Sequence, residues 1–258
     1  MVTDVIKGFL ILFFILVPIE RIFALHEQKI FRKAWTTDAI YYFLGYFIGR
    51  GTQLAISVLL IGHIFKGLLN TQLQILVASQ PLLLQFIEAV LISDIGYYMA
   101  HKLNHTIPWL WKFHAVHHSV EQLDWLATVR VHPIDQVFTK MFQVIPLYIL
   151  GFTKETFAGY IIFSAFIAFF IHANIKLKFR WFKWFVATPE FHHWHHSIDK
   201  KAYNKNFAAQ LPFLDLIFGT LYMPGGKMPD RYGISERIPS GYIGQILYPF
   251  RNRKNINF

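Results

Sequence analysis

The amino-acid sequence predicts an all-α integral membrane protein: a helical bundle of about three spans plus a short helical hairpin, with a cytoplasmic histidine-rich helical cap. Three observations lead to this prediction. Hydrophobic residues make up 54% of the 258 residues and charged residues only 16%, against about a quarter in soluble domains. The apolar residues are gathered in long blocks of Phe, Leu and Ile. Eight of the thirteen histidines fall into three tight groups between positions 101 and 196.

The charge balance fits a membrane protein better than a nucleic-acid-binding one. The net charge is +10, yet no nucleic-acid-binding motif is present. The basic residues lie between and after the apolar blocks, as expected where loops face an anionic cytoplasmic leaflet. We therefore expect no nucleic acid among the partners.

The sequence contains no cysteine. This excludes disulfides, zinc fingers, iron–sulfur clusters and thiol nucleophiles. Any metal ion must be held by nitrogen or oxygen.

The first half of the chain contains three apolar blocks. The first, about Val5–Ile19, is followed by charged residues and lacks a small-residue cleavage site, so it is expected to be an uncleaved anchor. The second, about Ala39–Phe65, is interrupted by Arg50 and several glycines. The third spans about Pro81–Ala100. These three blocks are the predicted N-terminal spans.

Two shorter blocks form the predicted hairpin. They run over about Val137–Phe152 and Thr156–Ile171, separated by a turn-like stretch at 151–154. Each block is about 16 residues, or roughly 24 Å as a helix, which is short for an upright span. A tilted or re-entrant hairpin is predicted, and both of its ends emerge on the same side of the membrane.

The hairpin therefore places all three histidine groups in one aqueous compartment. By this assignment only Lys7, Lys66 and Lys154 fall on the far side, and Arg50 and Lys140 lie within blocks. The remaining lysines and arginines fall on the histidine side, which the positive-inside rule makes cytoplasmic. The membrane would be the plasma or inner membrane in a bacterium and the endoplasmic reticulum in a eukaryote.

Three regions follow from this organisation. Residues 1–93 are expected to hold the N-terminal transmembrane helices, 94–220 the histidine-rich core, and 221–258 a cytoplasmic tail at the membrane surface. The tail is rich in Pro, Gly and charge, and Ile243–Phe250 resembles an apolar patch that lies on the membrane.

The histidine groups have the spacing of metal ligands. They are one HxxxH pattern and two HxxHH patterns: His101 and His105; His114, His117 and His118; His192, His195 and His196. Residues at i, i+3 and i+4 share a helix face, so each group is expected to present its imidazoles to a single centre. Neutral imidazole suits iron, zinc, copper and nickel. Eight ligands exceed what one ion accepts, so two metal ions are predicted.

The other histidines divide into three kinds. His26 and His63 are expected to be structural, because a lone histidine on an apolar face is usually hydrogen-bonded within the core. His132 and His172 lie on the same face as the groups, and we expect both to be metal ligands. His193 points to the other side of its helix and is expected to face the substrate or to support a ligand.

Acidic and aromatic residues also lie near the groups. The acids are too scattered for a carboxylate-bridged di-iron set. They either orient imidazoles or cap helices: Asp94, Glu121, Asp124, Asp135 and Glu190. Trp109 and Trp111 are expected in the interfacial aromatic belt.

The motifs around these histidines resemble the fatty acid hydroxylase/sterol desaturase superfamily of membrane di-iron oxygenases. The resemblance covers about residues 94–220 and rests on the segments that surround the groups. These segments are Asp94–Tyr98, Leu110–Phe113, Arg130–Pro133, Thr188–Phe191, Asn206-Phe207 and Leu214–Thr220. Asn204, Ala208 and His193 depart from the usual pattern, and none of them removes a motif histidine.

The resemblance implies two irons, dioxygen as co-substrate and hydroxylation or desaturation of a lipid such as a sterol, fatty acyl chain, alkylglycerol or carotenoid. It carries over eight histidines as iron ligands and catalytic residues: His101, His105, His114, His117, His118, His192, His195 and His196. The sequence has no flavin or nicotinamide fingerprint. A separate electron donor is therefore expected on the basic cytoplasmic face, similar to cytochrome b5, a ferredoxin or a flavin reductase.

Two other classes remain open from the residues. A membrane zinc-dependent hydrolase would also use histidines, although HExxH is absent. A non-enzymatic metal- or haem-binding membrane protein would place histidines singly on facing helices. Zinc is redox-inert and cannot oxidise an unactivated C–H bond, so the metal distinguishes these classes. Within the oxygenase class, desaturation or aldehyde deformylation competes with hydroxylation.

Overall fold

The computed structural model describes residues 2–55, 67 and 71–251. Within this part of the chain the regular structure is helical, apart from isolated bridges between Ala24 and Ile175 and between Ser197 and Tyr232. The all-α prediction is confirmed. The long helices are α1 (Val2–Ile22), α2 (Trp35–Ala55), α4 (Leu82–Thr106), α6 (Pro133–Leu150) and α7 (Lys154–His172).

Three of these helices, α1, α4 and α7, are long and apolar enough to cross a membrane. They correspond to the first and third predicted blocks and to the second arm of the hairpin. Helix α2 covers the first part of the second block, and the remainder of that block, with His63, lies outside the described residues. Helix α6, the first arm of the hairpin, is 18 residues long and packs against the candidate span α4.

The predicted hairpin is present. Helix α6 ends at Gly151, whose φ of +82° places it in the left-handed region and whose N–H bonds the carbonyl of Leu147. Helix α7 begins after Thr153, which accepts a hydrogen bond from the backbone N–H of Thr156 as its N-cap. Gly151 is required here because a side chain at this φ is strained.

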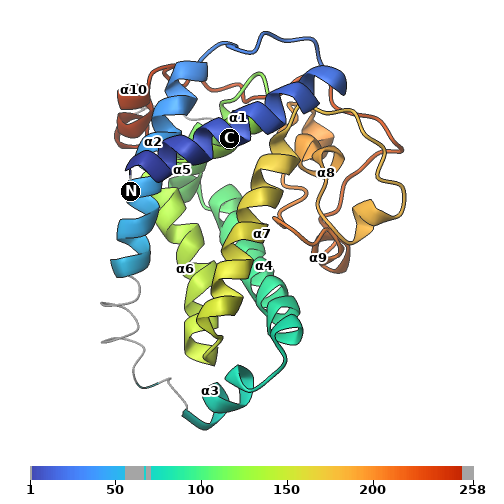
Figure 1. The fold of residues 1–258 in the computed structure, drawn as a ribbon. Helices are drawn as coiled ribbons and strands as arrows, with labels where there is room; N and C mark the ends of the chain where they lie inside the picture. Colours follow the sequence, from blue (N-terminus) through green and yellow to red (C-terminus); the bar gives the residue numbers. More distant parts are fainter. Residues whose placement is uncertain (1, 56–66, 68–70, 252–258) are drawn as a thin grey trace.

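The histidine-bearing helices meet at one end of the bundle. Helix α4 continues past the predicted block, which places His101 and His105 on its final turns. Helices α5 (Pro108–His118) and α8 (Pro189–His195) both start with proline at the first helical position, where the missing N–H costs nothing. In Figure 1, α5 and α8 lie near this end, and the short α3 (Thr71–Ala78) lies at the opposite end.

Helix α1 crosses the bundle near the histidine end (Figure 1). Its residues Leu16 and Val17 pack against Trp125 and Leu126 of the 3-10 helix η3 (Trp125–Val129). The carboxylate of Glu20 accepts hydrogen bonds from the backbone N–H groups of Trp125 and Asn174. These contacts hold α1 against η3 and against the residues that follow α7.

The C-terminal part is tied to the bundle by a buried carboxylate. Asp94 on α4 accepts hydrogen bonds from three successive backbone N–H groups at 209–211. Helix α9 (Phe213–Ile217) follows this loop. Helix α10 (Tyr242–Leu247) packs near α2 and leaves Ile243 exposed. The prediction that this segment lies on the membrane stays a prediction.

Candidate metal centre

Nine histidines come together in two groups. Within each group the ligand nitrogens all lie within 4.8 Å of one another. The first group consists of His101, His105, His114, His118 and His195, and the second of His117, His172, His192 and His196. The structure therefore gathers all eight motif histidines and adds His172 at the end of α7.

Each HxxHH motif contributes to both groups. In α5, His114 and His118 belong to the first group and His117 to the second; in α8 the i and i+4 residues belong to the second and His195 to the first. The prediction that each motif serves a single centre is wrong for both HxxHH motifs, whereas it holds for His101 and His105, which share the first group. Adjacent residues on a helix differ by about 100° in direction, whereas i and i+4 differ by about 40°. The i, i+4 pair therefore shares one group and i+3 reaches the other.

The two groups adjoin each other. The rings of His118 and His196, one from each group, are stacked with centroids 4.5 Å apart. The ring of His117 lies 4.6 Å from that of His196 and 5.5 Å from that of His114. This contact makes the two groups halves of one site that could hold two ions.

The outer nitrogens of several rings are fixed by backbone carbonyls. The Nδ1 atoms of His101, His195 and His172 donate to the carbonyls of Phe207, Lys205 and Ala168 at 2.7, 2.8 and 2.8 Å. The Nδ1 of His117 donates to the carbonyl of Arg130 at 3.2 Å. A proton on Nδ1 leaves Nε2 as a lone pair, which is the tautomer a metal ligand needs.

The inner nitrogens face one another without a proton between them. Nε2 of His101 lies 3.0 Å from Nε2 of His114, and Nε2 of His117 lies 3.3 Å from Nε2 of His172. In each pair both protons are already on Nδ1, so two lone pairs face each other. The buried Nε2 atoms of His105 and His195 have no hydrogen-bond partner within the described structure. A cation in each group relieves both problems, so the residues fit two imidazole-bound metal ions.

Burial keeps these imidazoles neutral. It lowers the pKa of His117, His118, His192 and His196 well below the ordinary value, and neighbouring histidines lower it further. Burial lowers the pKa of His195 to about 3. Metal binding needs the neutral ring, and the protein supplies it without a proton-release step.

Three other histidines of the described residues lie outside both groups. His132 is the N-cap of α6: its Nδ1 accepts from the N–H of Ile134, and its Nε2 bonds the carbonyl of Ile246 at 3.1 Å. Both of its ring nitrogens therefore bond other parts of the protein. The structure places His132 outside both metal groups, contrary to the prediction that it is a ligand. His193 and His26 both bond the hydroxyl of Tyr232.

The acidic residues have mostly structural partners. Asp135 alone among the five considered contacts a histidine of the two groups in the described structure, through its 2.8 Å bond with His114. Asp94 and Asp124 accept backbone N–H bonds, while Glu121 and Glu190 pair with lysines. Of these five, Asp124 caps a helix, as the N-cap of η3, and Asp135 orients an imidazole, whereas the other three have structural partners that neither interpretation predicted.

Trp111 is a neighbour of the site that the sequence interpretation did not include. Its ring lies 5.2 Å from that of His105 and 5.5 Å from that of His118, and its Nε1 donates to Glu236. It packs against the first group, and its place in the interfacial aromatic belt stays a prediction. Its spacing of three and seven residues from His114 and His118 was an available signal, because such residues share a helix face.

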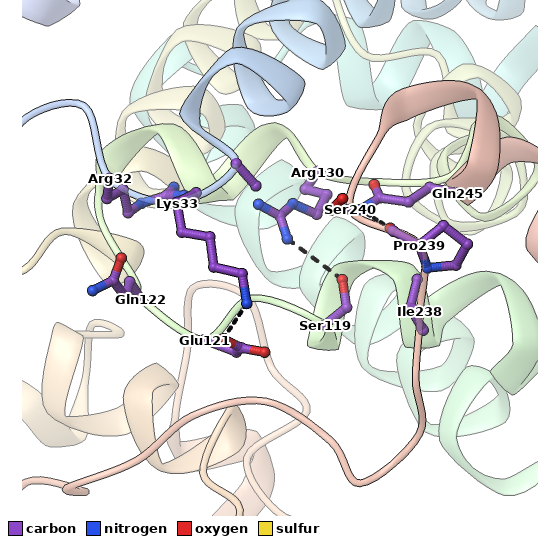
Figure 2. A pocket seen from close by; sticks show the side chains of 11 residues that line it. Arg32, Lys33, Ser119, Glu121, Gln122, Arg130, Ile238, Pro239, Ser240 and Gln245 are labelled. Carbon is purple, nitrogen blue, oxygen red and sulfur yellow. Dashed lines mark hydrogen bonds and ion pairs between the residues drawn. The ribbon is translucent and has the colours of Figure 1, made fainter.

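A small pocket lies beside the turn that follows α5 (Figure 2). It has a volume of about 60 Å³ and is lined by the loop at 32–34, the turn after His118 and residues 238–245. Arg130 lines it and binds Asp38 through two hydrogen bonds. Because the carbonyl of Arg130 accepts from His117, this ion pair also positions a metal-site histidine.

The site lies inside the part of the chain that carries a known family pattern. A model of the fatty acid hydroxylase family matches residues 86–220. The chain belongs to the fatty acid hydroxylase family. The matched residues include all nine histidines of the two groups, which lie on α4, α5, α7 and α8 and, for His196, at the C-cap of α8. The metal groups are therefore built entirely from the family region.

Relatives within this family act on lipid-like molecules. The chain is 34% identical over 178 residues to the ornithine lipid hydroxylase OlsE of Rhizobium tropici, covering 68% of this chain and 54% of that protein. It is 30% identical over 160 residues to the alkylglycerol monooxygenase of Danio rerio, covering 61% of this chain and 35% of that protein. It is 29% identical over 137 residues to the very-long-chain aldehyde decarbonylase CER1 of Arabidopsis thaliana, covering 48% of this chain and 21% of that protein.

The chain thus spans about half the length of the ornithine lipid hydroxylase and less of the other two. No solved structure matches the chain.

Proposed function

We propose that this chain is an O₂-dependent membrane di-iron oxygenase that hydroxylates a C–H bond of a lipid. One observation carries the proposal: nine histidines, eight of them buried, form two adjoining groups in which unprotonated nitrogens face one another. Family membership and the hydroxylase and monooxygenase relatives support it. The proposed iron ligands are these nine histidines, and His132 is left out because both of its nitrogens bond the protein.

Two irons, when bound, would supply the redox chemistry that activates O₂ for oxidation of an unactivated C–H bond. The chain's own residues prepare the site. Backbone carbonyls and Asp135 hold the rings in one tautomer. Burial excludes water from eight of the nine histidines. The apolar helices α4 and α7 lead from the hydrocarbon to the ligands at their ends.

The proposed substrate is an amphipathic lipid that diffuses within the bilayer. The relatives' names point first to an aminoacyl lipid such as ornithine lipid and next to an alkylglycerol. The decarbonylase relative keeps aldehyde cleavage as the alternative outcome. Electrons are proposed to come from a separate carrier that docks on the basic, cytoplasmic side.

The test combines metal analysis with isotope labelling. The full chain is expressed with iron in a lipid-producing host, and its lipids are compared with those of a host expressing the His195→Ala variant. We expect two irons per chain and a lipid heavier by one oxygen atom, which carries label from ¹⁸O₂ and not from H₂¹⁸O. An active preparation that contains zinc alone, or a product labelled from water, would contradict the proposal and favour a hydrolase.

A further inference from the structure

The segment between α7 and α8 exposes large aromatic side chains to its surroundings. Trp181 is 70% exposed and Phe185 58% exposed. Phe182 and Trp184 are the first and last residues of the 3-10 helix η4 (Phe182–Trp184), and each is 43% exposed. Four such rings in five residues are unusual on a surface that meets only water.

Helix α9 adds exposed aliphatic residues next to this segment. Leu216 and Ile217 are 62% and 68% exposed, whereas Asp215 between Leu214 and Leu216 is fully buried. The backbone N–H of Ala187 donates to the carbonyl of Gln210, which joins the two segments. Val186 and Phe213 also pack on the same core cluster. We name the exposed side chains of 176–186 and 216–218 the interfacial patch.

The patch carries positive charge and no exposed carboxylate. Lys176, Lys178 and Arg180 are exposed, and residues 176–186 contain no Asp or Glu. Lys183 is held by the carboxylate of Glu190 at 2.8 Å. Three cations therefore remain available beside the aromatic rings.

The chain geometry keeps the patch close to the membrane. Helix α7, a candidate span, ends at His172. The four residues to Lys176 can cover at most about 14 Å when extended. The backbone of Lys176 is moreover hydrogen-bonded to that of Phe23 at the end of α1, another candidate span.

We propose that the interfacial patch rests in the headgroup layer of the leaflet on the histidine side and prefers anionic lipid. Trp and Phe rings favour this layer, and exposed Lys and Arg are attracted to anionic headgroups there. Because Pro189 and helix α8 follow the patch directly, this contact sets the depth of three metal-site histidines relative to the bilayer. The inference does not depend on which metal is bound or which reaction is catalysed.

Depth-dependent quenching tests the position of the patch. The full chain is reconstituted in bilayers with bromine at shallow or deep acyl positions, and the emission of a Trp181→Phe/Trp184→Phe variant is subtracted from that of the unaltered chain. We expect the difference emission to be quenched more by shallow bromine than by deep bromine and to be protected from aqueous iodide. Strong iodide quenching with no bromine effect would overturn the proposal and leave the patch for a soluble partner.

Energy transfer tests the lipid preference. Transfer from tryptophan to dansyl-phosphatidylglycerol is compared with transfer to dansyl-phosphatidylcholine. A Lys176→Gln/Lys178→Gln/Arg180→Gln variant should lose the preference for the anionic probe. A Lys200→Gln/Lys201→Gln/Lys227→Gln variant, matched in charge at three other exposed lysines, should keep it. Equal preference in both variants would refute the electrostatic part.

Discussion

The carboxylate of Asp135 accepts a hydrogen bond from Nδ1 of His114 at 2.8 Å, and its other oxygen accepts one from Asn104 at 2.7 Å. The other metal-site histidines with a bonded Nδ1 in the described structure donate to backbone carbonyls, so Asp135 is the one anionic partner among them. A carboxylate in this position fixes the tautomer of the histidine and increases its basicity as a ligand.

Replacing Asp135 with Asn should therefore weaken the metal site while leaving the fold largely intact. We expect a loss of about 10–100-fold in metal affinity or activity, because an amide is a weaker acceptor for His114. Titration of the metal-free variant with Fe²⁺ measures this effect. Glu121→Gln, at an exposed pair with Lys33, is the control. Affinity equal to that of the unaltered chain would show that Asp135 serves packing alone.

Removing one histidine from each group tests the two-group arrangement. His117→Ala and His195→Ala should each lose at least one of two bound ions and abolish turnover, because each ring belongs to a different group. Iron content by mass spectrometry and product formation are the readouts. His26→Ala, which lies outside both groups and bonds Tyr232, should retain both ions. Full turnover in the His195 variant would remove that residue from the ligand set.

The close crossing of α4 and α6 predicts a severe effect at one glycine. A Cβ on Gly96 would lie 2.1 Å from the carbonyl oxygen of Phe142, so Gly96→Ala must force the helices apart. We expect a loss of about 1–3 kcal/mol or more in the free energy of unfolding. Gly45→Ala, where a Cβ meets nothing within 4 Å, should be neutral or stabilising. Thermal unfolding in detergent compares the two, and equal melting temperatures would refute the steric argument.

The buried ion pairs beside the site predict a second stability effect. Asp38 is fully buried and binds Arg130 at 2.5 Å and Arg32 at 2.8 Å. Asp38→Ala leaves two buried guanidinium groups with less compensation and should cost about 3–5 kcal/mol. Because Arg130 positions His117, iron affinity should fall as well. Glu121→Ala removes an exposed pair and should cost less than about 1 kcal/mol; a similar loss in both variants would contradict this ranking.

Acidification should destabilise the metal-free protein. Burial lowers the pKa of His195 to about 3, whereas an unfolded histidine titrates near pH 6.5. Between these values the unfolded chain binds a proton that the folded chain does not, so the free energy of unfolding falls as the pH drops from about 6.5 toward 3. Unfolding curves of the metal-free chain at several pH values measure this. A melting temperature that rises on acidification would contradict it.

The helices of the bundle could be predicted from the sequence because local residues mark where several of them begin and end. Gly151 and Thr153 mark the hairpin turn, and Pro108 and Pro189 mark the starts of the ligand helices. The spacing of the histidines also predicted a two-metal site. What spacing could not supply was the partner of each ring, since the carbonyls of Phe207 and Lys205 are about 100 and 10 residues from their histidines.

His132 and Trp111 are two residues whose side-chain contacts were not predicted from the sequence. His132 has the same residue type and lies on the same side as the ligands, yet its backbone position as an N-cap turns its ring toward Ile246. Trp111 was expected in the interfacial aromatic belt, and the orientation of α5 brings its ring against His105, a contact that the sequence interpretation did not include. The first outcome depends on the backbone at the start of α6 and the second on the rotation of α5 about its axis, and composition determines neither.

The second histidine of each HxxHH motif, His117 or His195, belongs to the other group from its neighbours, and this has a consequence for metal loading. Each ion would be held by histidines from both α5 and α8. The two ions would therefore link two helices that are over seventy residues apart in the chain. Neither position can be filled without drawing the other's ligands into place. Loading should therefore be close to all-or-none, and starvation for metal should loosen the whole cap at once instead of emptying one position.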